Sequence, residues 1–199
     1  MNKTKVKIEI FGQGKLPIYA TESSAGCDVF AAIDMIIEPG QTVCLPLNIK
    51  FALEGGVEAQ VRPRSGLSLK TTLRVPNSPG TIDADYRDEV CVILSNQYSD
   101  ENLLQEIKNG RVEKEKIKVI TAAEYAGVEA DSAEAFGIKN KNVVIDIEDG
   151  LMHGTVRISK GDRIAQIVFA KHCVADFEQV ESVAEIGKNR GGGFGHTGI

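Results

Sequence analysis

Residues 43–61 read VCLPLNIKFALEGGVEAQV, and they show most plainly what kind of fold this chain adopts. Apolar residues recur at every second position over residues 43–51 and again over residues 57–61. This spacing places the apolar side chains on one face of a β-strand. The Gly55-Gly56 pair between the two runs marks a turn. The stretch therefore predicts two successive strands, each with one face on a core.

The same period-two pattern recurs near both ends of the chain, at residues 6–10 and 156–158. Fuller apolar runs at residues 89–94 and 164–170 predict strands that are covered on both faces. Turn-forming residues separate these segments at Pro39-Gly40, Pro79-Gly80 and Lys160-Gly161-Asp162. Many short strands without a long amphipathic helix predict an all-β fold.

Residues 97–154 depart from this pattern and carry a periodicity of their own. The expected elements are a helix from Asp100 to near Gly110, a helix after Thr121 with Glu124 completing a capping box, a helical turn over Ser132–Gly137 and a strand over Val143–Ile147. Long connections inside compact domains are uncommon. We therefore interpret residues 97–154 as an ordered inserted subdomain within a single domain that spans residues 1–199.

The bulk properties exclude several classes of protein. The chain has 199 residues, the size of one ordinary domain, and a formal net charge of −5. Its Lys and Arg residues are dispersed, which argues against a protein that coats nucleic acid. The first residues lack the apolar run of a signal peptide, and no stretch approaches transmembrane length. We therefore expect a cytoplasmic protein without a membrane or nucleic-acid partner.

The four cysteines lie far apart, without Cys-x-x-Cys spacing or a histidine at ligand spacing. They are Cys27, Cys44, Cys91 and Cys173. This arrangement argues against a zinc site. We expect reduced thiols that are mostly packed inside the protein.

Five polar segments punctuated by glycine lie at the predicted strand ends. Together they carry the carboxylates, hydroxyls, amide and guanidinium groups that a triphosphate site requires. The segments are Ala25–Asp28, Arg62–Gly66, Gly80–Arg87, Gly161–Gln166 and Arg190–Gly198. These residue types are therefore consistent with a site that binds a triphosphate.

All five segments resemble, in order, the signature motifs of the trimeric dUTPase family, and with the strands between them they cover essentially the whole chain except the insert. The resemblance implies a jelly-roll-like dUTPase β-barrel, here with a small α/β insert. It implies hydrolysis of dUTP to dUMP and pyrophosphate with Mg²⁺, by attack of water on the α-phosphorus. It also implies a homotrimer whose sites are assembled where subunits meet.

The second segment leads from a tight turn into residues 67–70, which are expected to form a short helix. Backbone N–H groups at a helix start attract phosphate oxygens. By resemblance, Ser65 and Gly66 hold the phosphate chain of the substrate. Arg64 offers a planar fork that suits either a phosphate or a carboxylate that fixes the turn.

The third segment presents Asp83, Asp85 and Tyr86 at the end of a strand anchored by Ile82. Strand alternation predicts that Asp83 and Asp85 lie on the same side. By resemblance Asp83 is the base that accepts a proton from the attacking water. Tyr86 offers a flat apolar ring on which a deoxyribose can rest, with no room or partner for a 2′-hydroxyl. Asn77 matches a family position near the base-binding hairpin, which we expect it to help fix.

The first and fourth segments add an acidic and an amide side chain. Asp28 resembles the carboxylate that touches Mg²⁺ through water, an ion that keeps several waters and takes few protein ligands. The resemblance gives Gln166 a phosphate contact and Arg163 a role in bonding neighbouring segments. Arg163 is equally consistent with a plain structural ion pair.

The last segment is too rich in glycine to bury a core of its own. The resemblance implies that residues 188–199 are a flexible arm that closes over the site of a neighbouring subunit, with Arg190 and Thr197 on the terminal phosphate and Phe194 over uracil. Arg190 stands one residue closer to Phe194 than the family pattern has it, so Lys188 is an alternative for the phosphate contact. Asp88 stands where the family usually has glycine.

Two other functions fit parts of the sequence. A dCTP deaminase shares the fold, but the intact Asp83-x-Asp85-Tyr86 segment disfavours that interpretation. A regulatory protein that binds a partner through its insert is a different class, and some bacteriophage relatives carry an insert at a comparable place. The complete set of polar residues argues against vestigial catalysis, although a dUTPase with a protein partner at its insert combines both roles.

Overall fold

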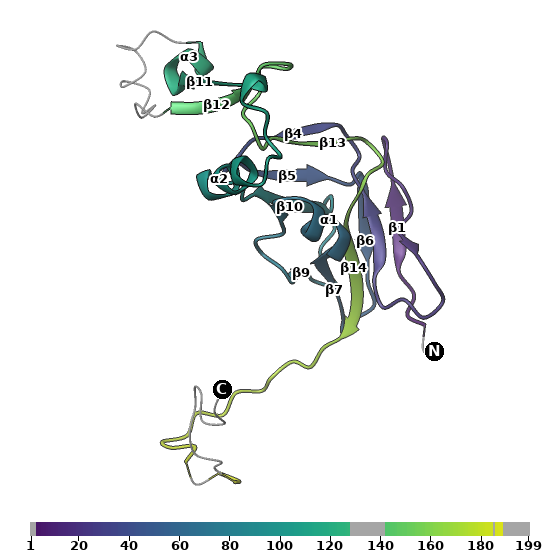
Figure 1. Ribbon diagram of the computed structural model, residues 1–199. Helices are drawn as coiled ribbons and strands as arrows, with labels where there is room; N and C mark the ends of the chain where they lie inside the picture. Colours follow the sequence, from purple (N-terminus) through teal and green to yellow (C-terminus); the bar gives the residue numbers. More distant parts are fainter. Residues whose placement is uncertain (1–2, 128–141, 185, 189–199) are drawn as a thin grey trace.

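A five-stranded antiparallel sheet forms the centre of the barrel in this computed structural model, which describes residues 3–127, 142–184 and 186–188 (Figure 1). In spatial order its strands are β2 (Ile18–Tyr19), β3 (Cys27–Phe30), β14 (Arg163–Lys171), β7 (Val57–Pro63) and β9 (Gly80–Ile82). The chain reaches these strands far apart in sequence. The sheet therefore brings four of the five polar segments into one layer.

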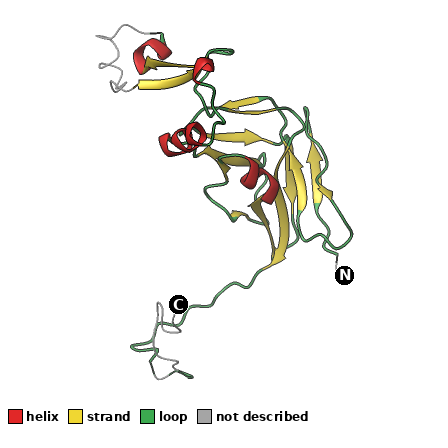
Figure 2. Ribbon diagram, viewed as in Figure 1, coloured by secondary structure: helices red, strands yellow, loops and turns green. Residues whose placement is uncertain are grey.

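Shorter antiparallel sheets close the rest of the barrel around a single core, and strands dominate the secondary structure (Figure 2). They pair β5 (Thr42–Pro46) with β10 (Cys91–Asn96) and β8 (Leu73–Arg74), β1 (Lys7–Ile10) with β6 (Ile49–Ala52), and β13 (Val156–Ile158) with β4 (Met35–Ile37). Fully buried aliphatic residues such as Leu45, Ile49 and Ile167 fill the interior. The predicted all-β, jelly-roll-like fold is confirmed.

The single strand expected over residues 43–51 is wrong. The structure has two strands, β5 and β6, with a corner at Leu47 and Asn48 between them. Asn48 has a φ of 52°, which Asn tolerates better than most residues. Leu45, Leu47 and Ile49 all stay buried through the corner. Because the apolar alternation continues unbroken, it does not reveal the change of direction.

The two fuller apolar runs form strands that differ in how many of their residues are buried. β14 lies inside the five-stranded sheet, and Ile164, Ala165 and Ile167 are fully buried. In β10 only every second residue is buried, so the prediction of cover on both faces is wrong for this strand. Its outer residues Cys91 and Ile93 line a surface pocket instead. The thiols are likewise less packed than expected, since only Cys27 is buried.

The segment between β10 and β13 contains most of the elements expected there. Helix α2 (Asp100–Lys108) begins after Ser99, whose backbone N–H donates to Asn102 Oδ1 at 2.9 Å. Thr121 Oγ1 accepts from the N–H of Glu124 at 3.1 Å and caps α3 (Ala122–Ala126). The predicted Val143–Ile147 strand is β12 (Asn142–Asp146), and the helical turn expected over Ser132–Gly137 lies outside the described residues.

Two elements in this segment escape the sequence pattern. The short 3₁₀-helix η1 (Lys114–Lys116) leads into β11 (Ile117–Thr121), which pairs with β12 in a small antiparallel sheet. This sheet and α3 lie beyond β4 and β13, at one end of the barrel (Figure 1). Among the described residues, no helix is both long and apolar enough to cross a membrane.

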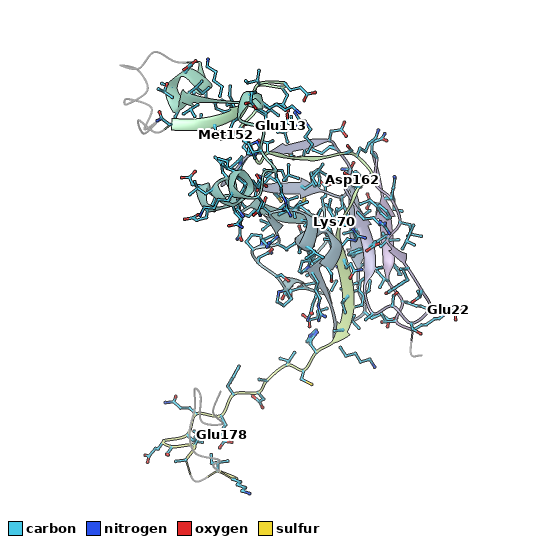
Figure 3. The ribbon with its side chains drawn as sticks, in the orientation of Figure 1. Glu22, Lys70, Glu113, Met152, Asp162 and Glu178 are labelled. Carbon is cyan, nitrogen blue, oxygen red and sulfur yellow. The ribbon has the colours of Figure 1, made fainter. Side chains whose placement is uncertain are left out.

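A cluster around His153 ties this segment to the returning chain. The Nδ1 atom of His153 lies 2.6 Å from Asp146 Oδ1 in β12, and its Nε2 atom lies 3.1 Å from Glu106 Oε2 in α2. The hydroxyl of Tyr98 donates to the same Glu106 oxygen at 2.6 Å, and its ring packs edge-on against the imidazole. Nearby, Tyr125 donates to Glu38 of the barrel and accepts from the N–H of Met152, which Figure 3 places beside the small sheet.

Two carboxylates on opposite ring nitrogens favour the charged imidazole. Burial alone would lower the pKa of His153, but hydrogen bonds and charges from Asp146 and Glu106 outweigh burial and raise it above its ordinary value. A raised folded-state pKa means that the stabilisation is fully present below the unfolded pKa of about 6.5. The stabilisation is then lost as the pH rises through the folded-state pKa.

We therefore expect the attachment of α2 and β12 to weaken as His153 loses its proton. His153→Phe keeps an aromatic ring beside Tyr98 but removes both hydrogen bonds, so amides of α2 should lose about tenfold protection from hydrogen exchange at pH 6. The difference between variant and wild type should shrink towards pH 9. His172→Phe, at an exposed histidine, is the control. Equal protection in wild type and His153→Phe at pH 6 would contradict this account.

Candidate functional site

A buried carboxylate, Asp28, joins three of the polar segments. Its Oδ1 atom accepts from Arg64 Nε at 2.9 Å and from Gln166 Nε2 at 3.0 Å, and its Oδ2 atom accepts from Arg163 Nη1 at 3.2 Å. Arg64 also donates to the carbonyl of Arg163 at 3.1 Å. We call these four residues the Asp28 cluster. It connects β3, the end of β7 and the start of β14.

The register of the central sheet brings the members of this cluster together. Asp28 in β3 stands opposite Gln166 in β14, and an irregularity between Arg163 and Ala165 shifts the register there. Gly26 allows the close approach, because a Cβ atom at this position would lie 3.1 Å from Gln166 Oε1 and the amide would have to shift. The glycine turn before Asp28 therefore makes room for the amide.

Asp28 stays ionised although its side chain is only 7% exposed. Burial alone would raise its pKa, but the hydrogen bonds from Gln166 and Arg64 and the charges of both arginines together hold the pKa below its ordinary value. A depressed pKa means that ionised Asp28 stabilises the fold above the unfolded pKa of about 4. That contribution is lost as the pH falls through the folded-state pKa.

Helix α1 (Ser65–Lys70) begins directly after Arg64, so the predicted short helix starts two residues earlier than expected. Ser65 and Gly66 are exposed in its first turn. Of the two partners considered for Arg64, the structure shows the carboxylate. Arg163 likewise makes an ion pair with Asp28, while 56% of its side chain stays exposed.

Asp83 and Tyr86 lie in a turn rather than in a strand. β9 ends at Ile82, and the N–H of Tyr86 donates to the carbonyl of Asp83 at 3.2 Å. The alternation expected to place Asp83 and Asp85 on one side therefore does not apply, since alternation requires extended backbone. Both aspartates are exposed.

The turn forms one wall of a pocket of about 330 Å³, which we call the Asp83 pocket. Asn77, Gly80 and Tyr86 line it together with Asp83, so the structure brings Asp83 together with the residues predicted at the sugar and at the base-binding hairpin. Asn77 packs closely on Gly80, where a Cβ atom would lie 2.9 Å from Asn77 Nδ2. The pocket presents a carboxylate, an aromatic ring and an amide to one small ligand.

The predicted site residues fall into two groups within the described chain. No member of the Asp28 cluster lines the Asp83 pocket, although both are reached from β7. Arg190, Phe194 and Thr197 lie outside the described residues.

Asp88 stands where the family usually has glycine, but its backbone does not require one. Among the described non-glycine residues only Asn48 has a positive φ, so aspartate at position 88 imposes no backbone strain.

Sequence reasoning missed part of the pocket wall. Cys44, Cys91, Ile93 and Glu89 line the Asp83 pocket as well. Cys44 and Ile93 face each other across β5 and β10. Their outward positions in the alternation were a signal that they do not belong to the core, but only the pairing of β5 with β10 shows which surface they share.

Comparison with protein families and known proteins gives one consistent answer. The family model described as dUTPase matches residues 13–107 and 151–198. The chain is 41% identical over 155 residues to the deoxyuridine 5′-triphosphate nucleotidohydrolase of Chlamydia caviae, and the match covers 77% of this chain and 92% of that protein. It is 35% identical over 187 residues to the Ehrlichia canis protein of the same name, covering 92% of this chain and 87% of that one.

Solved structures with a similar fold come from bacteriophages. The dUTPase of Staphylococcus bacteriophage 80alpha, solved with dUPNHPP, has a TM-score of 0.70 at 20% identity and covers 99% of this chain and 100% of its own. A point mutant of the dUTPase from phage phi11 of S. aureus, described with a structural Mg(II) ion, has a TM-score of 0.62 at 21% identity, with 89% and 97% covered. At this identity, the similarity concerns the fold alone.

The Asp28 cluster gives a direct stability prediction. Asp28→Asn removes the charge that two arginines share and should lower the free energy of unfolding by about 3 kcal/mol at pH 7, measured by urea unfolding. The difference from wild type should shrink as the pH falls below the unfolded pKa of about 4 and on through the lower folded-state pKa, because the wild type then takes up a proton at Asp28 as well. Asp149→Asn, at the more exposed Asp149–Arg157 pair, should cost much less than Asp28→Asn, because water screens the exposed pair. An equal loss in the two variants would show that the cluster contributes no more than a surface ion pair.

Proposed function

Since this chain belongs to the dUTPase family and is a dUTP diphosphatase, we propose that it splits dUTP by the attack of a water molecule oriented by Asp83 on the α-phosphorus. The observation that carries this proposal is the Asp83 pocket, in which a carboxylate, a tyrosine ring and an asparagine converge. The products are dUMP and pyrophosphate.

Asp83 is well placed to act as the base. It is exposed and stands at the first position of the turn that follows β9, so a substrate in the pocket can approach it. A carboxylate in hydrogen-bond reach of water can accept a proton as the water oxygen attacks phosphorus. The pyrophosphate group then leaves on the opposite side of the phosphorus.

Tyr86 supports discrimination between deoxyribose and ribose. Its hydroxyl donates to the carbonyl of Glu89 at 3.0 Å, which holds the ring across the turn while 40% of the residue stays exposed. A deoxyribose resting on this apolar face leaves neither space nor a polar partner for a 2′-hydroxyl. Asn77 and the backbone of the turn supply the polar groups for a pyrimidine edge. A deaminase stays the alternative that the intact turn disfavours.

The phosphate chain is assigned to Ser65, Gly66 and Gln166, with a contribution from Arg64. Ser65 and Gly66 present exposed N–H groups at the start of α1. Arg64 uses two of its five N–H donors on Asp28 and Arg163, so three remain for phosphate oxygens. Donors aimed at the phosphates stabilise the charge that develops as the bond breaks.

The donors of the Asp28 cluster fit Mg²⁺ only through water. A carboxylate has about four acceptor sites, and Asp28 uses three of them on Arg64, Arg163 and Gln166. The remaining site can accept from a water of the hydrated ion, which would be held mainly by the substrate phosphates. When bound, the ion would neutralise phosphate charge. The phi11 dUTPase is described with a structural Mg(II) ion, which supports binding of this metal by a protein of the same fold.

A homotrimer would unite the two groups of site residues. The Asp28 cluster and the Asp83 pocket are separate within one chain, and residues after β14 run away from the barrel, where Figure 3 labels Glu178. This stretch exposes an apolar residue at every third position from Val174 to Ile186, including Phe177 at 93% exposure. We propose that the stretch lies on a neighbouring subunit and delivers Arg190 or Lys188, Phe194 and Thr197 to a site there. Residues 188–199 would form the closing arm.

The inserted segment is proposed as an accessory module of this single domain. The family model leaves out residues 108–150, and no described residue of that range lines the Asp83 pocket or touches the Asp28 cluster. Exposed Leu104, Val119 and Ile147 give the inserted segment a partly apolar surface for a protein partner.

Replacing residues 108–150 by a Gly-Ser linker should therefore leave trimer assembly and dUTP hydrolysis unchanged. Loss of hydrolysis in a folded trimer would show that the insert takes part in the site.

Removing the proposed base should separate turnover from binding. Asp83→Asn keeps the size of the side chain but cannot take the proton, so kcat should fall by roughly 10²-fold or more. Binding of α,β-imido-dUTP, measured by calorimetry, should stay near that of wild type. Asp85→Asn in the same turn is the matched control. Near-normal turnover in Asp83→Asn would remove this residue from its role.

Mixing two inactive variants should test the shared site. Deleting residues 188–199 should abolish most activity with little change in melting temperature, because a glycine-rich segment without a core contributes little to folding. The deletion variant is then mixed with Asp83→Asn, and trimers are reassembled after mild denaturation. The mixture should regain part of the activity, because some sites in hybrid trimers combine an intact Asp83 from one chain with an intact arm from another. Hybrid trimers that stay inactive would show that each chain completes its own site.

A further inference from the structure

Asn48 sits at the corner between β5 and β6, where three parts of the barrel meet. It is the one non-glycine residue with a positive φ in the described part of the chain. Such a backbone persists in a residue with a side chain only where its surroundings hold it in place. The residues around Asn48 therefore show what the corner is built to support.

One carboxylate oxygen holds both nitrogen atoms of Asn48. The backbone N–H of Asn48 donates to Glu89 Oε1 at 2.8 Å, and its side-chain amide donates to the same oxygen at 2.9 Å. On the other side, Asn48 Oδ1 accepts from the N–H of Gln13 at 3.1 Å, and its carbonyl accepts from the N–H of Phe11. A Cβ atom on Gly12 would lie 2.7 Å from Asn48 Oδ1, so the first loop also closes tightly on this side chain.

Glu89 carries the connection onward to the Asp83–Tyr86 turn. Its carbonyl accepts from the hydroxyl of Tyr86 at 3.0 Å, and its side chain lines the Asp83 pocket. The next residue, Val90, donates to the carbonyl of Ile49 at 2.9 Å and accepts from the N–H of Leu47 at 3.2 Å. Hydrogen bonds thus connect residues 47–49 of the corner to residues 89 and 90, which follow the turn.

Within the turn, Arg87 Nη1 donates to the carbonyls of Ala84 and Tyr86, and Ala84 packs on the core, but the Tyr86 hydroxyl bonds only to Glu89 among the described residues. Residues 83–88 belong to no strand, and Asp83 and Tyr86 are both exposed. On one side the turn continues β9, and on the other it is fixed at Glu89 and Val90. The position of the Tyr86 ring over the pocket therefore depends on where Glu89 is held.

We propose that the Asn48–Glu89 pair is a positioning element of the nucleotide site. The pair fixes where the Tyr86 ring and the Asp83 side chain lie relative to the Asp83 pocket. Neither side chain takes part in the chemistry. The inference rests on the proposed function, because it assigns the pair to sugar discrimination by Tyr86. A glycine at position 48 would adopt the same φ but would lack the amide that bonds to Glu89.

Asn48→Gly is the sharpest test, because it removes the amide without straining the backbone. The dUTP-to-UTP ratio of kcat/KM should fall by about tenfold, and kcat for dUTP should fall as well. A merely structural role would lower the fraction of active protein, which scales both substrates equally and leaves the ratio unchanged. Glu89→Ala should lower the dUTP-to-UTP ratio by a similar factor. Glu89→Gln should retain most of the ratio, because its amide oxygen can still accept a hydrogen bond. The double variant Asn48→Gly/Glu89→Ala should have a ratio no lower than that of either single variant. Asn109→Gly, at the end of α2, is the control.

A spectroscopic reporter separates this inference from the proposed function. Biosynthetic labelling with 3-fluorotyrosine places a ¹⁹F nucleus on each of the four tyrosines and keeps the Tyr86 hydroxyl that bonds to Glu89. The Tyr86 signal is the one that is absent from the spectrum of Tyr86→Phe. Adding Asn48→Gly to the labelled protein should shift and broaden this signal and leave the signals of the other tyrosines in place. If dUTP is not hydrolysed at all, the proposed function fails while the reporter still tests the Asn48–Glu89 pair. An unchanged reporter together with an unchanged dUTP-to-UTP ratio would overturn the positioning role.

Discussion

A buried carboxylate is costly unless charged donors surround it, and Asp28 is the point on which the site depends. Arg64, Arg163 and Gln166 all donate to it, and each comes from a polar segment at the end of a strand. Ionised Asp28 therefore fixes the start of α1 relative to β14. Asp28 holds these donors in place without a ligand. On the proposed function, phosphate oxygens would meet an arranged surface, and little reorganisation would be needed when negative charge develops.

The Asp83 pocket is supported in a different way. Its functional turn has no strand partner of its own and is held from the corner at Asn48, through Glu89, and from β9. The two halves of the site thus rest on separate parts of the barrel, which suits a site shared between subunits. The insert attaches elsewhere, through the His153 cluster, so a change in the insert need not disturb either half.

The sequence predicts the β-frame and the starts of α2 and α3, because these depend on local spacing, whereas Asn77, Asp83 and Tyr86 were identified through the family resemblance. Strand periodicity, the cap at Thr121 and the glycine turns all act within a few residues. What it misses depends on contacts between distant segments. The corner at Asn48 is hidden by unbroken alternation, the strand β11 is completed only by β12, and Cys44 joins the pocket only through the register with β10. That Arg64 binds a carboxylate likewise depends on the pairing of β3 with β14, which places Asp28 beside Arg64.

The central claim is that water held by Asp83 attacks the α-phosphorus of a deoxyuridine nucleotide. Hydrolysis of dUTP in water enriched in ¹⁸O tests it most directly, with the products analysed by mass spectrometry. The account predicts one labelled oxygen in dUMP and none in pyrophosphate, because the oxygen of the attacking water stays on the phosphorus that it attacks. Label in pyrophosphate would mean attack at the β-phosphorus and would contradict the account.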